Sequence, residues 1–200
     1  MKTSVALDLS KLPLHGLRTA SLTWWGTLAF MLIEGTGFAL TIAVYLYLMS
    51  LAPRWPLDAP PPDLLPGTLL TVVLIASLWP NILIARWARE QTWGRVRVGL
   101  IVMSLMGVLP LIPRAFEFSA MHSRWDQNAY GSIVWVMLGL HTTHIITDLI
   151  DTLVLTCLMF SPHGRNQRRF GDVTDNAMYW NFVVATWLPM YLCLYWVPRL

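Results

Sequence analysis

Long apolar runs that are almost free of charge are the feature that most restricts what this chain can fold into. A helix that crosses a membrane needs about 20 mostly apolar residues. Five windows approach that requirement, at about residues 24–48, 69–85, 98–112, 132–160 and 178–197. Only 12% of the residues are charged, against about 25% in soluble domains. The sequence therefore predicts an all-α polytopic membrane protein with a five-helix transmembrane bundle, and it argues against a soluble enzyme.

The segments between these windows predict a simple organisation. Residues 1–22 carry charges and a proline among their apolar positions, which favours a cytoplasmic N-terminal arm over a secretory signal. Residues 23–200 are expected to form one transmembrane domain. Proline is frequent in residues 52–66, which indicates an extended connection between the first two windows. Pro80 and Asn81 predict a kink or a buried polar contact in the second window, while Pro110 and Pro113 shorten the third.

The positions of Lys and Arg predict the orientation, because cytoplasmic segments carry the excess of these residues. Four lie on one side of the predicted bundle, namely Arg54, Arg114, Arg124 and Arg199. Ten lie on the side of the N-terminus, namely Lys2, Lys11, Arg18, Arg86, Arg89, Arg95, Arg97, Arg165, Arg168 and Arg169. We therefore expect a cytoplasmic N-terminus and a C-terminus outside. These basic residues are scattered over short segments rather than clustered on one surface, so no nucleic-acid partner is expected.

Ionisable side chains inside the windows are the candidate functional residues, because each costs about 2.5–3.5 kcal/mol at the centre of a bilayer. Glu34 lies in the first window. The fourth window contains His141, His144, Asp148 and Asp151, which share an arc of roughly 80° on a helix. These four residues are predicted to form one polar stripe that faces the bundle interior.

The stripe does not predict a metal or haem site. Four side chains spread over about three turns of one helix cannot converge on one ion, and no other window is rich in His or Cys. Hydrogen-bonded packing against neighbouring helices is the simpler interpretation. Glu34 has two interpretations that the residues alone leave open: a protonatable group in a proton path or lipid cleft, and a neutral acid hydrogen-bonded inside the bundle.

Two further charged pairs lie near the ends of windows. Arg114 and Glu117 follow the third window, where an interfacial salt bridge is expected. Arg168 and Arg169 precede the fifth window. They are candidates for contact with anionic lipid head groups, and a plain role in setting the orientation explains them equally well.

Several motifs, in order along the chain, resemble the cytochrome c oxidase subunit III family of the haem–copper terminal oxidases. Tyr130-Gly131-Ser132 followed by Gly139-Leu140-His141-Thr142-Thr143-His144 is similar to the YGS and GxHxxH helix of that family. The stretch from Tyr179-Trp180-Asn181-Phe182 to Trp187-Leu188-Pro189-Met190-Tyr191 is similar to its YWHFVDxxWLxxY helix. Arg114-Ala115-Phe116-Glu117-Phe118 resembles the acidic segment that precedes the YGS helix, and Glu34 falls at the place of the carbodiimide-reactive glutamate of the family. The resemblance covers about residues 23–198.

The chain also departs from the common form of the family. Asn181 and Val184 stand where the last helix of that form has His and Asp, so no role of that pair is carried over. The common form has seven spans, of which the first two surround bound lipid in a V-shaped arrangement. This chain resembles a five-span form without those two helices, although Arg168 and Arg169 fall near family positions that approach phospholipid head groups.

The resemblance implies a subunit with no catalytic residue, haem, copper or other cofactor of its own. The haem and copper would lie on partner subunits, with subunit I as the main contact, subunit II as a second partner, and phospholipid around the chain. In the family, this subunit supports proton uptake and protects the oxygen-reducing site during turnover. Glu34, His141 and His144 are then the candidates for the functional interior, and a bacterial inner membrane is the expected location.

Two other functions remain open at this stage. The first is an accessory subunit, similar to subunit III, of a quinol oxidase or a nitric oxide reductase. The second is an independent proton-coupled transporter that uses Glu34 and the polar stripe as a relay. A transporter often has broken helices in paired halves, and the sequence shows no such pair.

Overall fold

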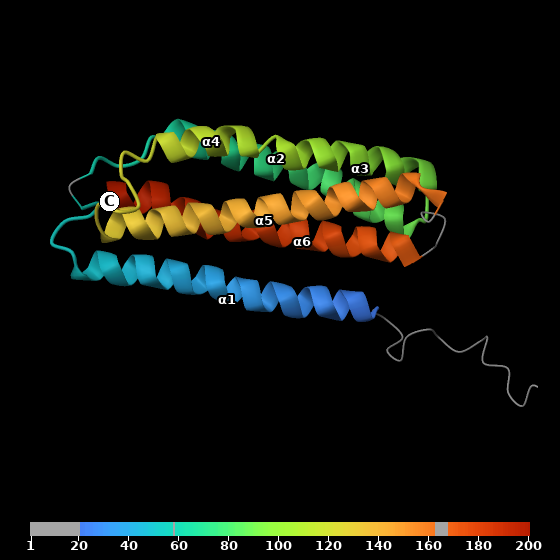
Figure 1. The fold of residues 1–200 in the computed structure, drawn as a ribbon, viewed down its shortest axis with the longest axis horizontal. Helices are drawn as coiled ribbons and strands as arrows, with labels where there is room; N and C mark the ends of the chain where they lie inside the picture. The colour runs from blue at the N-terminus through green and yellow to red at the C-terminus, as the bar shows by residue number, and fades with distance from the viewer. Residues whose placement is uncertain (1–20, 58, 163–167) are drawn as a thin grey trace, which may run out of the picture.

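The computed structural model describes residues 21–57, 59–162 and 168–200, and these parts of the chain are helices and short connections. Five helices among them are long and apolar enough to cross a membrane, as the sequence predicts. The sequence-based assignment of residues 1–20, which make up most of the expected N-terminal arm, lies outside the described residues. The helices run side by side along the long axis of the molecule (Figure 1).

The elements follow one another in a simple order. Each candidate span contains one of the windows predicted from the sequence. The helices are α1 (Leu22–Leu51), α2 (Leu64–Arg89), α3 (Trp93–Val108), α4 (Leu111–Ser119), α5 (Ala129–Phe160) and α6 (Arg168–Tyr191), the last continued by the π-helix η2 (Leu192–Trp196) and the short 3₁₀ helix η3 (Val197–Arg199). Helices α3 and α4 together form the third span, Trp93–Ser119.

The ends of the helices have local causes in the sequence. The side chain of Ser21 accepts a hydrogen bond from the backbone N–H of Trp24, which caps the start of α1. Asn128 caps α5 in the same way through the N–H of Gly131. Pro110 separates α3 from α4 without ending the span, because the chain stays helical in its backbone angles there. The third span is therefore longer than the prolines alone indicate.

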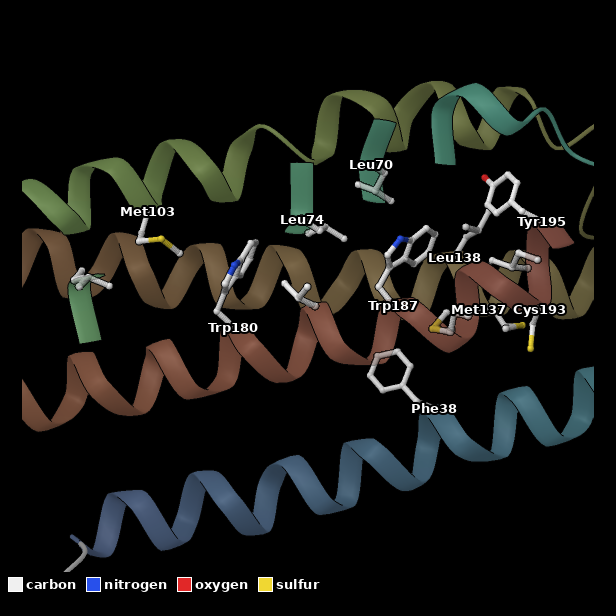
Figure 2. Packing of buried hydrophobic residues seen from close by; sticks show 14 of the residues in the cluster. Phe38, Leu70, Leu74, Met103, Met137, Leu138, Trp180, Trp187, Cys193 and Tyr195 are labelled. Carbon is white, nitrogen blue, oxygen red and sulfur yellow. The ribbon is translucent and has the colours of Figure 1, made fainter. Parts of the chain in front are cut away.

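The core lies between α2, α3, α5 and α6. Trp180 and Trp187 project from α6 toward Leu74 and Leu70 of α2 (Figure 2), and all four side chains are buried. Both indoles are also hydrogen-bonded, Trp180 to the hydroxyl of Ser77 and Trp187 to that of Thr71, each at 2.8 Å. Buried N–H groups need such partners in a membrane, so these bonds fix how α6 lies against α2.

Helix α1 is less embedded than the others. It contacts α5 and α6, and Phe38 and Tyr45 are its buried side chains. Near the end of α1, Tyr45 accepts a hydrogen bond of 2.9 Å from the indole of Trp55. Most of its other large apolar side chains face outward, as expected for a helix that meets lipid or a neighbouring chain.

Candidate functional site

Glu34 lies near the middle of α1 and points at α5 and α6. The hydroxyl of Tyr179 donates a hydrogen bond of 2.7 Å to Oε2 of Glu34. Nε2 of His144 lies 3.1 Å from Oε1. Phe38 covers the imidazole from one side, with 4.7 Å between the ring centres. A carboxyl group, an imidazole and a phenol from three different helices thus meet at one place, and we call them the Glu34 cluster.

The contacts of His144 leave one of its two ring nitrogens without a hydrogen bond. Nδ1 of His144 lies 2.6 Å from the carbonyl oxygen of Leu140, which can only accept, so Nδ1 carries a hydrogen. In the neutral imidazole, Nε2 then has a lone pair, as do the oxygens of the Glu34 carboxylate. Nε2 lies 3.1 Å from Oε1 of Glu34 but makes no hydrogen bond to any described residue. The cluster therefore places a carboxyl group and an imidazole nitrogen side by side, next to a phenolic donor.

The Glu34 cluster borders a cleft between α1, α5 and α6 with a volume of about 650 Å³. Asp148 and Asp151 from the predicted polar stripe line this cleft together with Glu34. The side-chain amide of Asn176 donates to both aspartates, at 3.4 Å to Asp148 and 3.0 Å to Asp151. The two acids of the stripe therefore face a neighbouring helix and are held by hydrogen bonds. Asp148 is buried as predicted, whereas Asp151 is exposed at the edge of the cleft and does not face the bundle interior.

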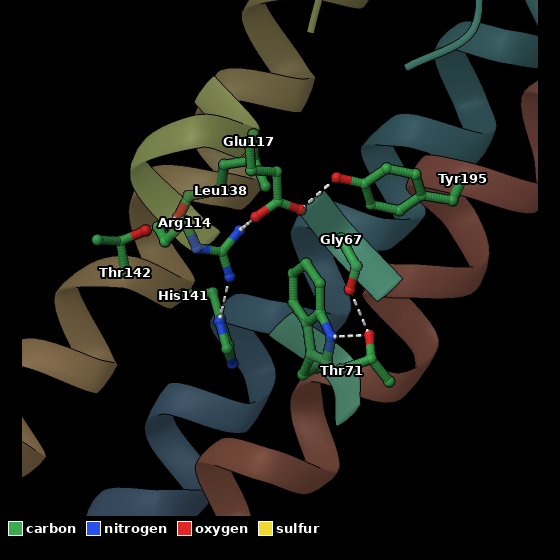
Figure 3. A network of polar contacts seen from close by, with 9 residues as sticks. Gly67, Thr71, Arg114, Glu117, Leu138, His141, Thr142 and Tyr195 are labelled. Carbon is green, nitrogen blue, oxygen red and sulfur yellow. Dashed lines mark hydrogen bonds and ion pairs between the residues drawn. The ribbon is translucent and has the colours of Figure 1, made fainter. Parts of the chain in front are cut away.

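His141 lies apart from the Glu34 cluster, in a second polar group around Arg114 (Figure 3). Nη1 of Arg114 lies 2.5 Å from Oε2 of Glu117, and Nη2 lies 2.8 Å from Nδ1 of His141. The hydroxyl of Tyr195 donates to the other oxygen of Glu117. The guanidinium also lies over the ring of Trp187, at 4.4 Å. We call these five residues the Arg114 network.

The contacts of His141 determine its tautomer. Arg114 has no acceptor, so Nδ1 of His141 must accept. Nε2 lies 3.0 Å from the carbonyl oxygen of Val183 and must donate. His141 is therefore a neutral imidazole with both nitrogens occupied, and it has no free position for a proton relay or a metal.

The structure differs from the sequence-based expectation for Arg114 and Glu117. The two residues do form an ion pair, but they are buried within the third span rather than exposed at an interface. The third span continues beyond Pro110 into α4, and this continuation carries the pair into the bundle. A buried ion pair also needs further hydrogen bonds, which Tyr195 and His141 supply.

Other predicted site residues occupy simpler positions. Arg169 pairs with Asp172 at 2.9 Å near the start of α6, and Arg168 begins that helix. Among the residues that the structure describes, no three His, Cys, Asp or Glu side chains gather in a way that could hold a metal ion.

The sequence does not identify the partners of two polar residues. Tyr179 appears there only as part of a motif, and its bond to Glu34 joins residues that lie 145 positions apart. Asn81 predicts a kink or a buried polar contact. The structure shows the contact: its amide donates to the carbonyl of Ala177 at 2.8 Å and to the side-chain oxygen of Asn181 at 2.9 Å. The signal for both was a polar residue within an apolar window.

Comparison with known proteins decides the family. The sequence model described as cytochrome c oxidase subunit III matches residues 25–198. The chain belongs to this family. As a subunit III of a haem–copper oxidase, it is one chain of a larger oxidase complex, and its transmembrane helices agree with that membership.

Relatives named cytochrome c oxidase subunit 3 come from distant sources. The protein from Drosophila yakuba is 27% identical over 195 residues, which cover 91% of this chain and 73% of the relative. The protein from the cyanobacterium Synechocystis sp. is 25% identical over 179 residues, which cover 87% of this chain and 75% of the relative. The protein from Loxodonta africana is 30% identical over 163 residues, which cover 75% of this chain and 60% of the relative. This subunit III therefore resembles relatives from animals and from bacteria.

Proposed function

We propose that this subunit III is a non-redox subunit of a proton-pumping cytochrome c oxidase in a bacterial inner membrane. It packs mainly against subunit I, with subunit II as a second partner, and its N-terminus faces the cytoplasm. The haem and copper of the complex lie on those partners. Membership of the family supports the assignment. The excess of Lys and Arg on the N-terminal side supports the orientation.

The Glu34 cluster is the part of the chain that supports proton uptake. One observation carries this proposal: Glu34 and His144, two side chains that can bind a proton, lie 3.1 Å apart beside a cleft of about 650 Å³ that Glu34 itself lines. Protonatable groups that border a cleft can exchange protons with water entering there. Asp148 and Asp151 lie on the same cleft and extend the set of carboxyl groups. We further propose that Arg168 and Arg169, at the start of α6, contact phospholipid head groups.

The substitution Glu34→Gln tests the proton-related role. The amide keeps the size of the side chain and a hydrogen bond to Tyr179, but it cannot bind or release a proton. We expect the complex to assemble with its normal haem content and to lose activity faster during continuous turnover. The measurement is the decay of oxygen consumption with the number of turnovers.

The control for this test is Glu90→Gln. Glu90 is an exposed acid that pairs with Arg86 at 3.2 Å, far along the chain from the cleft. The control variant is expected to decay at the wild-type rate. Equal decay in Glu34→Gln and the wild type would show that the Glu34 cluster has no proton-related role.

The assignment to an oxidase is tested by recovering the chain from its native membrane in mild detergent. Co-elution with a haem–copper subunit I, an a-type haem spectrum and oxidation of cytochrome c would agree with the proposal. Recovery with a quinol oxidase or a nitric oxide reductase would instead identify the other respiratory complex.

A further inference from the structure

Asn181 is a polar side chain on the outer surface of α6, near the middle of the fifth span, Arg168–Arg199. Its oxygen accepts a hydrogen bond of 2.9 Å from the side-chain amide of Asn81. The two N–H groups of its own amide meet no acceptor among the described residues. At this depth a lipid acyl chain offers no acceptor, so a donor that faces lipid is costly. Asn181 therefore indicates a neighbour other than lipid.

The surface around Asn181 has the pattern of a helix-packing face. Three further exposed side chains follow it on α6 at the spacing of one helix face, namely Ala185, Leu188 and Leu192. We call these four residues the α6 face. Ala185 is small, and small residues let the backbones of two membrane helices approach closely. The α6 face thus combines a polar donor, a small side chain and two leucines along one line.

A hollow of about 310 Å³ adjoins the inner end of the α6 face. Trp24 of α1, Arg89 of α2 and Asn181 of α6 line it. The indole N–H of Trp24 and the guanidinium of Arg89 also have no acceptor within the described parts of the chain. Asp175 is the one acid of the lining, and its side chain already bonds to Thr23. The hollow thus presents three side chains with unpartnered donors, which matches a partner side chain that carries an oxygen acceptor.

We propose that the α6 face packs against a transmembrane helix of subunit I, and that a side-chain oxygen of this helix accepts a hydrogen bond from the amide of Asn181. A side chain must supply the oxygen, because the backbone carbonyls of a helix are bonded within that helix. Ser, Thr, Asn and Gln form such bonds between membrane helices. Family membership makes this chain one part of an oxidase complex, which favours a helix of another subunit over a second copy of this chain. The inference rests on the proposed packing against subunit I, and it adds the surface and the contact that make this packing specific.

The test places a photo-reactive probe on the α6 face in the complete oxidase in its native membrane. Leu188→p-benzoylphenylalanine puts the probe on an exposed side chain of that face, outside the core. The control is the same substitution at Leu105, an exposed leucine of α3, which packs against α2 and α5. After irradiation and mass spectrometry, we expect the Leu188 probe to be joined to a transmembrane peptide of subunit I. The Leu105 probe should give no such product.

A second measurement tests the hydrogen bond itself. Asn181→Leu removes the N–H donors and leaves the bond from Asn81 to the carbonyl of Ala177, which still joins α2 to α6. The dissociation constant of the subunit for the rest of the complex should rise about fivefold, the effect of one neutral hydrogen bond. Thr143→Val is the matched control, because Thr143 is exposed on α5 and its hydroxyl bonds to the carbonyl of Gly139 in the same helix at 2.9 Å. That variant should keep the wild-type constant.

Three results would overturn the inference: a Leu188 probe joined only to lipid, a Leu188 probe joined to a second copy of this chain, and an unchanged dissociation constant in Asn181→Leu. A subunit I product from the Leu105 probe alone would also overturn it, while leaving the proposed function intact. If subunit I is absent from the purified complex, the proposed function fails together with this inference. The two failures are therefore distinguishable.

Discussion

Breaking the buried ion pair between Arg114 and Glu117 should strongly lower the stability of the bundle. In Arg114→Met, the Glu117 carboxylate loses its 2.5 Å partner, and Nδ1 of His141 loses its donor. In Glu117→Leu, Arg114 loses its counter-charge, and the hydroxyl of Tyr195 loses its acceptor. Each single change leaves a charge or a polar group without a partner in a place from which water is excluded.

The size of the effect follows from the burial of the pair. Removing one partner of a buried ion pair costs about 3–5 kcal/mol, whereas replacing both partners by apolar residues of similar volume is often neutral or stabilising. Arg114 is 1% exposed and Glu117 is 0% exposed, so this ion pair is fully buried. We expect each single variant to lose about 3–5 kcal/mol of stability. The double variant Arg114→Met with Glu117→Leu should recover most of this loss.

The assay is the temperature at which the detergent-solubilised oxidase releases this subunit. A loss of about 3–5 kcal/mol corresponds to a fall of roughly 6–20 °C for a chain of this size, at about 2–4 °C per kcal/mol. Arg86→Met is the control, because Arg86 and Glu90 pair on the surface and such pairs contribute about 0–1 kcal/mol. Single variants that release the subunit at the wild-type temperature, or a double variant that is worse than both, would refute the reasoning.

The same release assay checks three further substitutions. Gly67→Ala should lower the release temperature by the cost of overpacking, about 1–3 kcal/mol, because a Cβ atom at Gly67 would collide with the ring of Tyr195. Gly94→Ala should leave it unchanged or raise it slightly, since a Cβ atom there meets nothing within 4 Å and alanine is the better helix former. Asn81→Leu should cost about 1–3 kcal/mol, because Asn181 and the carbonyl of Ala177 lose their donor; an unchanged release temperature would show that these two acceptors find other donors.

The sequence predicted the helices well because the signal for a span is local. Twenty apolar residues are needed whatever the neighbours are, so the windows around Glu34 and His144 were found from composition alone. The third span was underestimated, because proline weakens a helix pattern in sequence while the neighbouring helices hold α4 in line in the structure.

The candidate site was predicted only in part because its geometry depends on which helices meet. The helical period placed His141 and His144 on one arc, but it could not show that their rings go to different partners. His144 reaches Glu34 on α1, whereas His141 reaches Arg114 on α4. Tyr179 lies on a third helix, and nothing in a single sequence couples it to Glu34. Such pairings require the packing of the whole bundle.

The loose attachment of α1 has a consequence for how the chain responds to damage. Lipid is as apolar as the outward face of α1, so moving this helix away from the bundle would lose little burial of apolar surface. The contacts that would be lost are those with α5 and α6, chiefly of Glu34 and Phe38. Helices α2 to α6 therefore form the main packed body of the chain, and α1 lies along its edge. A substitution that weakens the contacts of Glu34 should displace α1 alone, leaving α2 to α6 folded and still able to assemble.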